Sequence, residues 1–327
     1  TGSYSISFFA MRTLFVTNDK VTYSSATFEK VLENRTIISQ RLGELSSASS
    51  GTHPLYSGYS EGFGPSSADV LIPAFVAAYQ GKSAENYPVD VLKVLPLPNW
   101  RVTYNGLTKI AFFKKYFRSI TVNHGYTSTL NVGGFTNNQR YRDVDELSRI
   151  SETLIELDLD SNFITKYQYN SISINEDFSP LINFDMQTLN KIQARFEIRR
   201  GRNIGLNVGN QQITEQTTVQ YTFGAGYAFP LPLPFTIKGK RLNSDLKLRG
   251  DVSWRNNRSL VRKISDNTHT PNAGQNVISV KITGDYAVTQ SLNVRLFYDY
   301  VLNIPVISNT FKTANTNFGV SIRFSIS

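Results

Sequence analysis

Apolar and polar residues alternate with a period of two along most of this chain. The period holds through residues 318–326 and recurs at 292–300, 278–288, 246–254 and 219–229. Because successive side chains of a β-strand point to opposite faces, this period predicts strands with one apolar and one polar face. We therefore expect an all-β fold.

The strand count follows from the number of such segments. Residues 120–132 and 191–209 also alternate. Less regular strands are expected at 3–15, 98–105, 162–175 and 179–187. The total is about eleven strands, in an antiparallel up-and-down order.

Two kinds of connection are expected between these strands. Short polar turns are predicted at 210–211, 256–257 and 289–291. Long loops are predicted at 230–243, 265–274 and 302–315. Short turns on one side and long loops on the other are usual for outer-membrane β-barrels.

Helical patterns interrupt the strands near the N-terminus. Residues 25–45 place apolar residues at helical spacing after a candidate N-cap, Ser25, and residues 67–80 form an apolar run around Pro73. We expect residues 1–15 to form a barrel strand, 16–97 a helical and loop insertion that serves as an extramembrane cap or gate, and 98–327 about ten further barrel strands. A short aromatic and basic segment, 108–117, is expected at a membrane rim.

Alternation alone fits either a soluble β-sandwich or a transmembrane barrel. Segments such as 191–209 are longer than the ~5–6 residues of an ordinary strand and exceed the ~9–11 that a tilted strand needs to cross a bilayer. The chain also carries 17 Tyr and 21 Phe, and Tyr suits the lipid–water boundary. No apolar run approaches the ~18 residues of a transmembrane helix. The barrel is the favoured interpretation.

A barrel assigns the two strand faces to water and to lipid. Because backbone groups in hydrocarbon must all be paired, the sheet has to close. The chain begins within a strand, without a start Met or a signal peptide, so we expect it to be a piece of a longer protein that supplies the rest of the ring. Residues expected to face the lumen are Arg195, Glu197, Lys247, Arg249, Asp251, Lys281, Asp285, Asn293, Arg295, Asp299 and Arg323. Residues expected to face lipid are Val219, Tyr221, Phe223, Leu246, Leu248, Val280, Ile282, Val294, Leu296, Phe318, Val320, Ile322 and Phe324.

The sequence offers little for catalysis. There is no Cys, and the three histidines, His53, His124 and His269, lie far apart without a metal-binding spacing. The acidic cluster at 143–160 lacks the EF-hand pattern and is interpreted as a solvated loop or amphipathic helix. The arginines of the segment 199–202 are interpreted as the end of a long strand rather than as a phosphate site. We expect no catalytic residue, metal or cofactor, and no enzyme.

Six ordered segments resemble one known family. They are ADVLIPAFVAAYQGK (68–82), LPLPNWRVTYNGLTKI (95–110), FFKKYFRSITVNHGY (112–126), NEDFSPLINFDM (175–186), the run that begins SDLKLRGDVSWRNN and ends LVRKI (244–264), and TANTNFGVSIRF (313–324). These segments resemble the C-terminal region of the SprA/Sov family, the outer-membrane translocon of the type IX secretion system of Bacteroidota.

The resemblance implies a location, an activity and partners. The family forms a very large barrel in the cell outer membrane that passes folded cargo proteins, and it is also required for gliding motility. The implied partners are a PorV-type outer-membrane β-barrel shuttle, a periplasmic plug protein, other type IX secretion components, secreted cargo proteins and outer-membrane lipid, with no nucleic acid. The alternative from composition, given a net charge of +9, is a soluble basic β-sandwich that binds nucleic acid or polysaccharide.

Overall fold

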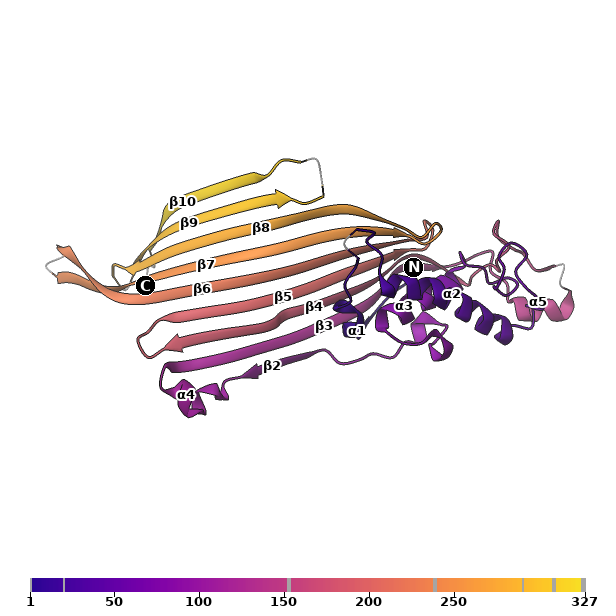
Figure 1. The fold of residues 1–327 in the computed structure, drawn as a ribbon, viewed down its shortest axis with the longest axis horizontal. Coiled ribbons are helices and arrows are strands. Elements are labelled where there is room, and N and C mark those ends of the chain that lie inside the picture. The colour runs from indigo at the N-terminus through magenta and orange to yellow at the C-terminus, as the bar shows by residue number, and fades with distance from the viewer. Residues whose placement is uncertain are drawn as a thin grey trace.

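One large antiparallel sheet, with helices packed against one end of it, makes up the described part of the chain (Figure 1). The computed structural model describes residues 2–19, 21–151, 154–237, 240–289, 291–307 and 310–324, without the side chains of 233–243.

The described residues contain ten strands and several helices. The strands are β1 (Gly2–Ser7), β2 (Trp100–Tyr104), β3 (Phe117–Asn137), β4 (Tyr167–Thr188), β5 (Gln193–Asn207), β6 (Gln212–Ile237), β7 (Lys240–Lys263), β8 (Thr268–Ala287), β9 (Leu292–Pro305) and β10 (Thr313–Phe324). The α-helices are α1 (Met11–Leu14), α2 (Ala26–Leu45), α3 (Ala68–Gln80), α4 (Ala111–Lys114) and α5 (Val144–Ile150). Three 3₁₀ helices are η1 (Ala84–Asn86), η2 (Val91–Lys93) and η3 (Gly106–Lys109).

The strand order confirms an antiparallel up-and-down fold. From β3 to β10 each strand pairs with the next one along the chain, while β1 and β2 both pair with the outer edge of β3. The sheet is open, with β10 at one edge and β1 and β2 at the other. We name the end that carries α2 and α3 the insertion end, and the opposite end, with α4 and the β4–β5 turn, the turn end (Figure 1).

The expected count of about eleven strands was one too high. Residues 162–175 and 179–187 were expected to be separate strands, but they belong to the single strand β4. Register shifts lie between Phe178 and Ile182 against β5, and between Asp177 and Asn183 against β3. They mark an irregularity that the strand passes through without ending. A bulge bends a strand and breaks its alternation locally, which is why the sequence looked like two strands.

Of the three expected long loops, 230–243 and 265–274 are mostly strand, and half of 302–315 is strand. Within 230–243, β6 continues to Ile237 and β7 starts at Lys240. β8 begins at Thr268 and β9 continues to Pro305, which shortens the other two loops. The predicted turn at 256–257 lies inside β7 instead. These segments are rich in Pro, Asn and Gly, so their composition favours turns, but strand pairing overrides it. The predicted turn at 210–211 is confirmed.

The edge of the sheet next to β3 is a composite strand. β1 pairs with residues 129–135 of β3, and β2 continues along 122–126. Between them the Phe8 amide donates to the Ser128 carbonyl at 2.9 Å, and the Leu97 amide donates to the Ser7 carbonyl at 3.1 Å. The chain therefore leaves the sheet edge after β1 and returns to it before β2 at the same point, with the helical insertion in between. The strand expected at 3–15 ends at Ser7, where the chain turns into this insertion.

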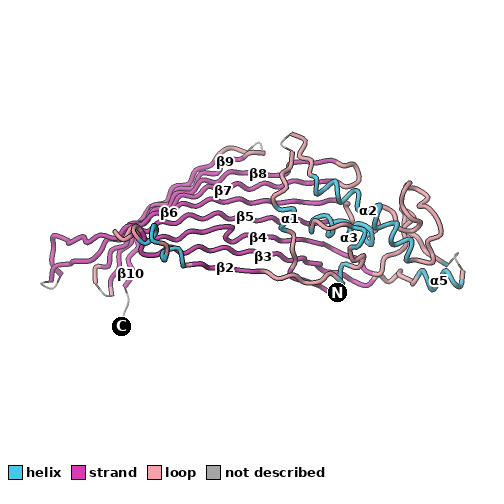
Figure 2. Tube along the Cα trace, turned by 60° about the horizontal axis from the view of Figure 1, so that its bottom comes forward, coloured by secondary structure: helices cyan, strands magenta, loops and turns pink. Residues whose placement is uncertain are grey.

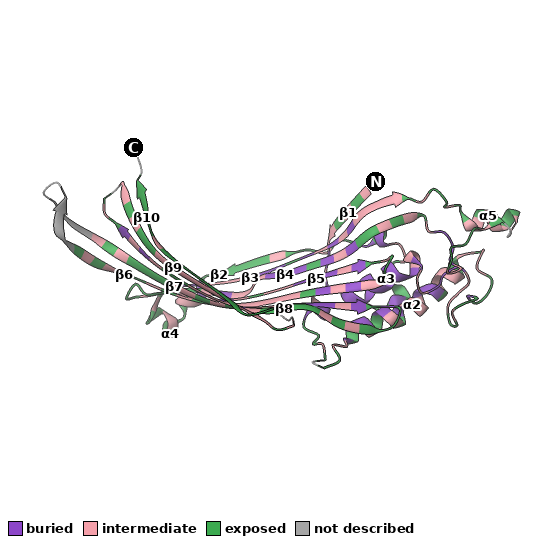
Figure 3. Ribbon diagram, turned by 90° about the horizontal axis from the view of Figure 1, so that it is seen from above, coloured by how far each residue is buried: buried purple, intermediate pink, exposed green. Residues whose placement is uncertain are grey.

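The insertion buries the main hydrophobic core against one face of the sheet. α3 is apolar on nearly all sides, and 11 of its 13 residues are buried, because α2 and the sheet both pack against it. Figure 2 shows α2 and α3 together at the insertion end of the strands. It ends at Gly81, whose φ of 68° is the left-handed conformation that a helix C-terminus favours in glycine. Figure 3 shows buried residues gathered where α2 and α3 cover the sheet. The helix predicted after Ser25 is confirmed as α2.

Candidate functional site: the two faces of the sheet

The apolar residues of neighbouring strands lie on the same face. Phe196 of β5 pairs with Phe223 of β6, which pairs with Val252 of β7, and Val252 pairs with Val280 of β8. Directly paired residues of antiparallel strands point to the same side. We name the side defined by these four residues the apolar face and the opposite side the polar face.

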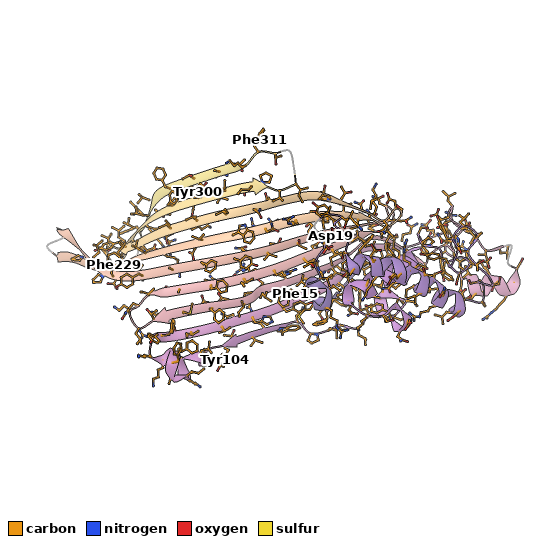
Figure 4. The ribbon with its side chains drawn as sticks, viewed as in Figure 1. Phe15, Asp19, Tyr104, Phe229, Tyr300 and Phe311 are labelled. Carbon is orange, nitrogen blue, oxygen red and sulfur yellow. The ribbon has the colours of Figure 1, made fainter. Side chains whose placement is uncertain are left out.

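The apolar face is covered at the insertion end and bare toward the turn end. Its covered part packs against α2 and α3 and consists of Leu130, Val132, Ile172, Ile174, Ile204, Leu206 and Ile213, all at most 1% exposed. Its bare part, named here the apolar band, runs along β7 from Leu246 to Trp254 and includes Phe223, 57% exposed, and Phe318, 80% exposed. In Figure 4, Tyr104 and Phe229 lie toward the turn end, whereas Phe15 lies beside α1.

The register places all thirteen residues expected to face lipid on the apolar face. Through the pairings of β6 to β10 these are Val219, Tyr221, Phe223, Leu246, Leu248, Val280, Ile282, Val294, Leu296, Phe318, Val320, Ile322 and Phe324. Many large side chains of this band are covered by no element of the described residues, so a large apolar patch meets the surroundings of the sheet.

The residues expected to face a lumen lie together on the polar face. They are Arg195, Glu197, Lys247, Arg249, Asp251, Lys281, Asp285, Asn293, Arg295, Asp299 and Arg323. The register adds an order that the sequence does not display, because Asp251 pairs with Lys281, and Lys281 pairs with Asp299. Opposite charges therefore alternate across three neighbouring strands.

A second charged row lies closer to the turn end. Lys247 pairs with Asp285, which pairs with Arg295, and Arg295 Nε donates to Asp285 Oδ1 at 2.5 Å. On β5, Glu197 forms ion pairs with both Arg195 and Arg199. Opposite charges placed directly across a sheet stabilise it modestly.

An open cleft of about 700 Å³ lies on the polar face, with lining residues from β3 to β9. Its lining includes Arg195, Asp251 and Lys281 together with serines, threonines and glycines. Such a surface favours hydration, because most of its lining side chains are polar or charged.

The insertion is anchored to the apolar face by a buried ion pair at the border of the apolar band. Arg202 Nη2 lies 2.7 Å from Glu176 Oε2, and both side chains are almost fully buried. Arg202 also donates to the Thr13 carbonyl at 2.9 Å, and the Tyr126 hydroxyl donates to Glu176 at 2.7 Å. Arg200 donates to the Leu14 carbonyl at 2.7 Å. The sheet therefore binds the backbone around α1.

A second buried pair anchors the start of α2. Arg262 of β7 lies 3.2 Å from Glu215 of β6 and donates to the Tyr23 carbonyl at 2.6 Å. The Arg262 guanidinium lies over the Phe28 ring, and the His269 imidazole packs edge-on against the same ring. Burial, helped by the nearby positive charge of Arg262, lowers the pKa of His269. This histidine is thus favoured as the neutral form.

Sequence reasoning missed these anchors. Arg200, Arg202, Glu215 and Arg262 all occupy apolar-face positions, where the alternation alone requires apolar residues. Residues of opposite charge at such positions on adjacent strands were the sequence signal that could have indicated these buried ion pairs. Arg199, in contrast, points to the polar face and pairs with Glu197.

The remaining titratable clusters are dispersed. His53 lies in the loop after α2, His124 in β3 and His269 in β8, and no group of three or more metal-ligating side chains occurs in the described residues. In the acidic segment 143–160 the structure places α5, whose N-cap Asp143 accepts hydrogen bonds from two backbone amides.

No protein-family model and no curated protein matches the chain. Among the described residues, no helix is both long and apolar enough to cross a membrane.

Proposed function

We propose that this chain forms part of the wall of an outer-membrane protein translocon. In this proposal the apolar band faces lipid and the polar face lines a water-filled passage for folded proteins. The observation that carries it is the sorting of a single sheet into a bare apolar face and a charged face.

The height of the apolar band supports a membrane. On β7 the band runs from Leu246 to Trp254, which agrees with the ~9–11 residues that a tilted strand needs to cross a bilayer. After Trp254, β7 continues to Lys263. In this proposal that part of the strand extends past the membrane at the insertion end. There the same face is covered by α2 and α3, as a surface in water requires.

The open edges support a larger ring. Strand β10 and the composite strand of β1 and β2 each leave one edge unpaired among the described residues. Hydrocarbon does not tolerate unpaired backbone groups. We infer that further strands from outside this chain complete a closed barrel in the bacterial outer membrane.

Transport of protein cargo is the activity that suits the polar face. Its alternating rows, such as Asp251 with Lys281 and Asp299, present balanced charge, and the described residues hold no cluster of metal-ligating side chains. The resemblance of six segments to the SprA/Sov family points in the same direction. It implies type IX secretion, gliding motility, and partners that include a PorV-type shuttle, a periplasmic plug and cargo.

The position of the insertion refines its proposed role. It lies on the lipid-facing side of the wall, beyond the apolar band, and not over the polar face. A cap or gate built from it would therefore act from the outer rim of the barrel. The anchors Arg202 and Arg262 hold it there.

The soluble sandwich remains the rival, and one experiment separates the two. All strands of the described residues belong to one sheet, so a sandwich would need another layer to cover the apolar band. The test is fractionation of cells that express the intact protein. We expect recovery only with detergent, from the outer membrane. A detergent-free, monodisperse soluble form of this chain alone would refute the barrel.

A further inference from the structure

A trough crosses the apolar band near the turn end. Small residues form its floor, since Ala225 of β6 pairs with Gly250 of β7 and both line the cavity. A Cβ added to Gly250 would meet no atom within 4 Å. The cavity measures about 880 Å³, and Tyr227 and Leu248 contribute to its lining. It is an apolar groove of molecular size in a face that otherwise carries large side chains.

Basic residues lie at the rim of this trough. Lys191, in the turn between β4 and β5, belongs to the lining itself. The Leu189 amide of that turn donates to the Tyr116 carbonyl at 3.1 Å, which joins the turn to the segment around α4. That segment carries the exposed basic residues Lys109, Lys114 and Lys115.

Negative charge is missing from this rim. From residue 94 to residue 139, the stretch that includes the α4 segment, the sequence contains five Lys or Arg and no Asp or Glu. Two carboxylates at the turn end of the strands, Asp185 and Asp245, belong to the polar face. Exposed apolar side chains, Ile110 and Phe112 among them, accompany the lysines. Aromatic residues beside lysines are typical of the interface between lipid tails and headgroups.

We propose that the trough and its basic rim form a binding site for an anionic phospholipid. One acyl chain lies along the floor of Ala225 and Gly250, and the phosphate lies at Lys191, with the lysines of the α4 segment around it. An apolar groove alone would accept any lipid chain. The one-sided charge of the rim selects a negative headgroup, as basic juxtamembrane clusters do.

This inference rests on the proposed function, because the site exists only if the apolar band faces lipid. The test uses the intact protein, extracted in detergent and stripped of lipid. It is incubated with phosphatidylglycerol or with phosphatidylcholine of the same acyl chains, and bound lipid is counted by native mass spectrometry. Two variants alter the site. Gly250→Leu fills the trough with a side chain, and Lys191→Gln removes the positive charge at its rim.

Matched controls lie on the polar face. Gly205→Leu fills a position where a Cβ is equally free of neighbours, and Lys281→Gln removes a lysine of the charged row. We expect phosphatidylglycerol to bind in preference, Gly250→Leu to abolish this binding, and Lys191→Gln to weaken it about fivefold, the effect of one basic side chain near an anionic surface. The controls should bind as the parent does.

Three outcomes would overturn the proposal. They are equal retention of the two lipids, equal loss in Gly250→Leu and Gly205→Leu, and full binding by Lys191→Gln. Circular dichroism establishes whether each variant is folded. If Gly250→Leu does not fold, the lipid binding of Lys191→Gln alone tests the proposal. A protein that needs detergent yet shows no lipid preference would refute this site alone. A protein that needs no detergent would refute the proposed function.

Discussion

Arg202 of β5 and Glu176 of β4 form an ion pair that is at most 3% exposed on either side, with 2.7 Å between Nη2 and Oε2. The pair lies where the apolar face passes from the bare band to the part covered by the insertion. Arg202 also contacts the Thr13 carbonyl, so the pair joins two strands to the backbone around α1.

Removing one partner of this pair should release the insertion. In Arg202→Met the buried Glu176 carboxylate loses its countercharge, and an uncompensated buried charge costs about 3–5 kcal/mol. We expect faster cleavage between α1 and α3 in limited proteolysis of the folded protein. The double variant Arg202→Met with Glu176→Leu should recover most of the loss, because no charge remains buried.

Arg258→Met is the control for this prediction. Arg258 lies on the same face in β7 but is exposed, so its loss should leave the cleavage rate unchanged. If Arg202→Met were cleaved no faster than Arg258→Met, the ion pair would not hold the insertion.

The two faces of the sheet could be predicted from sequence because alternation is a local property. In each strand the sequence shows which alternate positions are apolar. Strand pairing then brings the apolar positions of neighbouring strands to the same face, as the pairing of Phe223 with Val252 shows. The order of charges across strands could not be predicted. Asp251 and Lys281 lie far apart in the sequence and meet only through the register.

The composite edge strand and the positions of the strand ends also could not be predicted from the sequence. Ser7 and Leu97 are joined by a backbone hydrogen bond across the whole insertion, and no local pattern marks that contact. The Pro-rich end of β6 resembles a loop in isolation. It becomes strand because β7 pairs with it, as in the pairing of Pro230 with Asp245.

A charge on the apolar band should be costly in a membrane. Val252 is 48% exposed, and it lies within the stretch of β7 between Leu246 and Trp254. If this face meets lipid, Val252→Arg should destabilise the protein by about 2–4 kcal/mol. The measurement is the urea midpoint of unfolding in phospholipid vesicles.

The neighbouring residue provides the comparison. Ser253 lines the cleft on the polar face, so Ser253→Arg should shift the same midpoint far less. Equal shifts for Val252→Arg and Ser253→Arg would mean that the two faces do not meet lipid and water respectively.

Reversing one charge in the row on the polar face should have a small effect. Lys281→Glu would place three carboxylates side by side, the new one lying between Asp251 and Asp299. Like charges directly opposite one another destabilise a sheet, by about 0.2–1 kcal/mol for each pair. We expect a lower urea midpoint at low salt that recovers as salt screens the repulsion. A shift independent of salt would contradict an electrostatic origin.

The stability of the insertion should depend on pH through Asp69, in the first turn of α3. Burial, and then the negative charge of Asp90, raise the pKa of Asp69 to about 6. The native insertion therefore holds a proton that the unfolded chain releases near pH ~4. The insertion should lose stability as pH rises from about 4 to 6, and the full penalty should persist above that window.

Substitution of Asp69 by Asn removes this dependence without changing the side chain's size. Because the amide carries no charge, Asp69→Asn should raise the urea midpoint for loss of helical circular dichroism above pH ~6 and leave it nearly unchanged at pH ~4. Glu33→Gln, on the exposed side of α2, should change neither value. A gain in Asp69→Asn that was equally large at the lower pH would show that packing, and not ionisation of Asp69, is responsible.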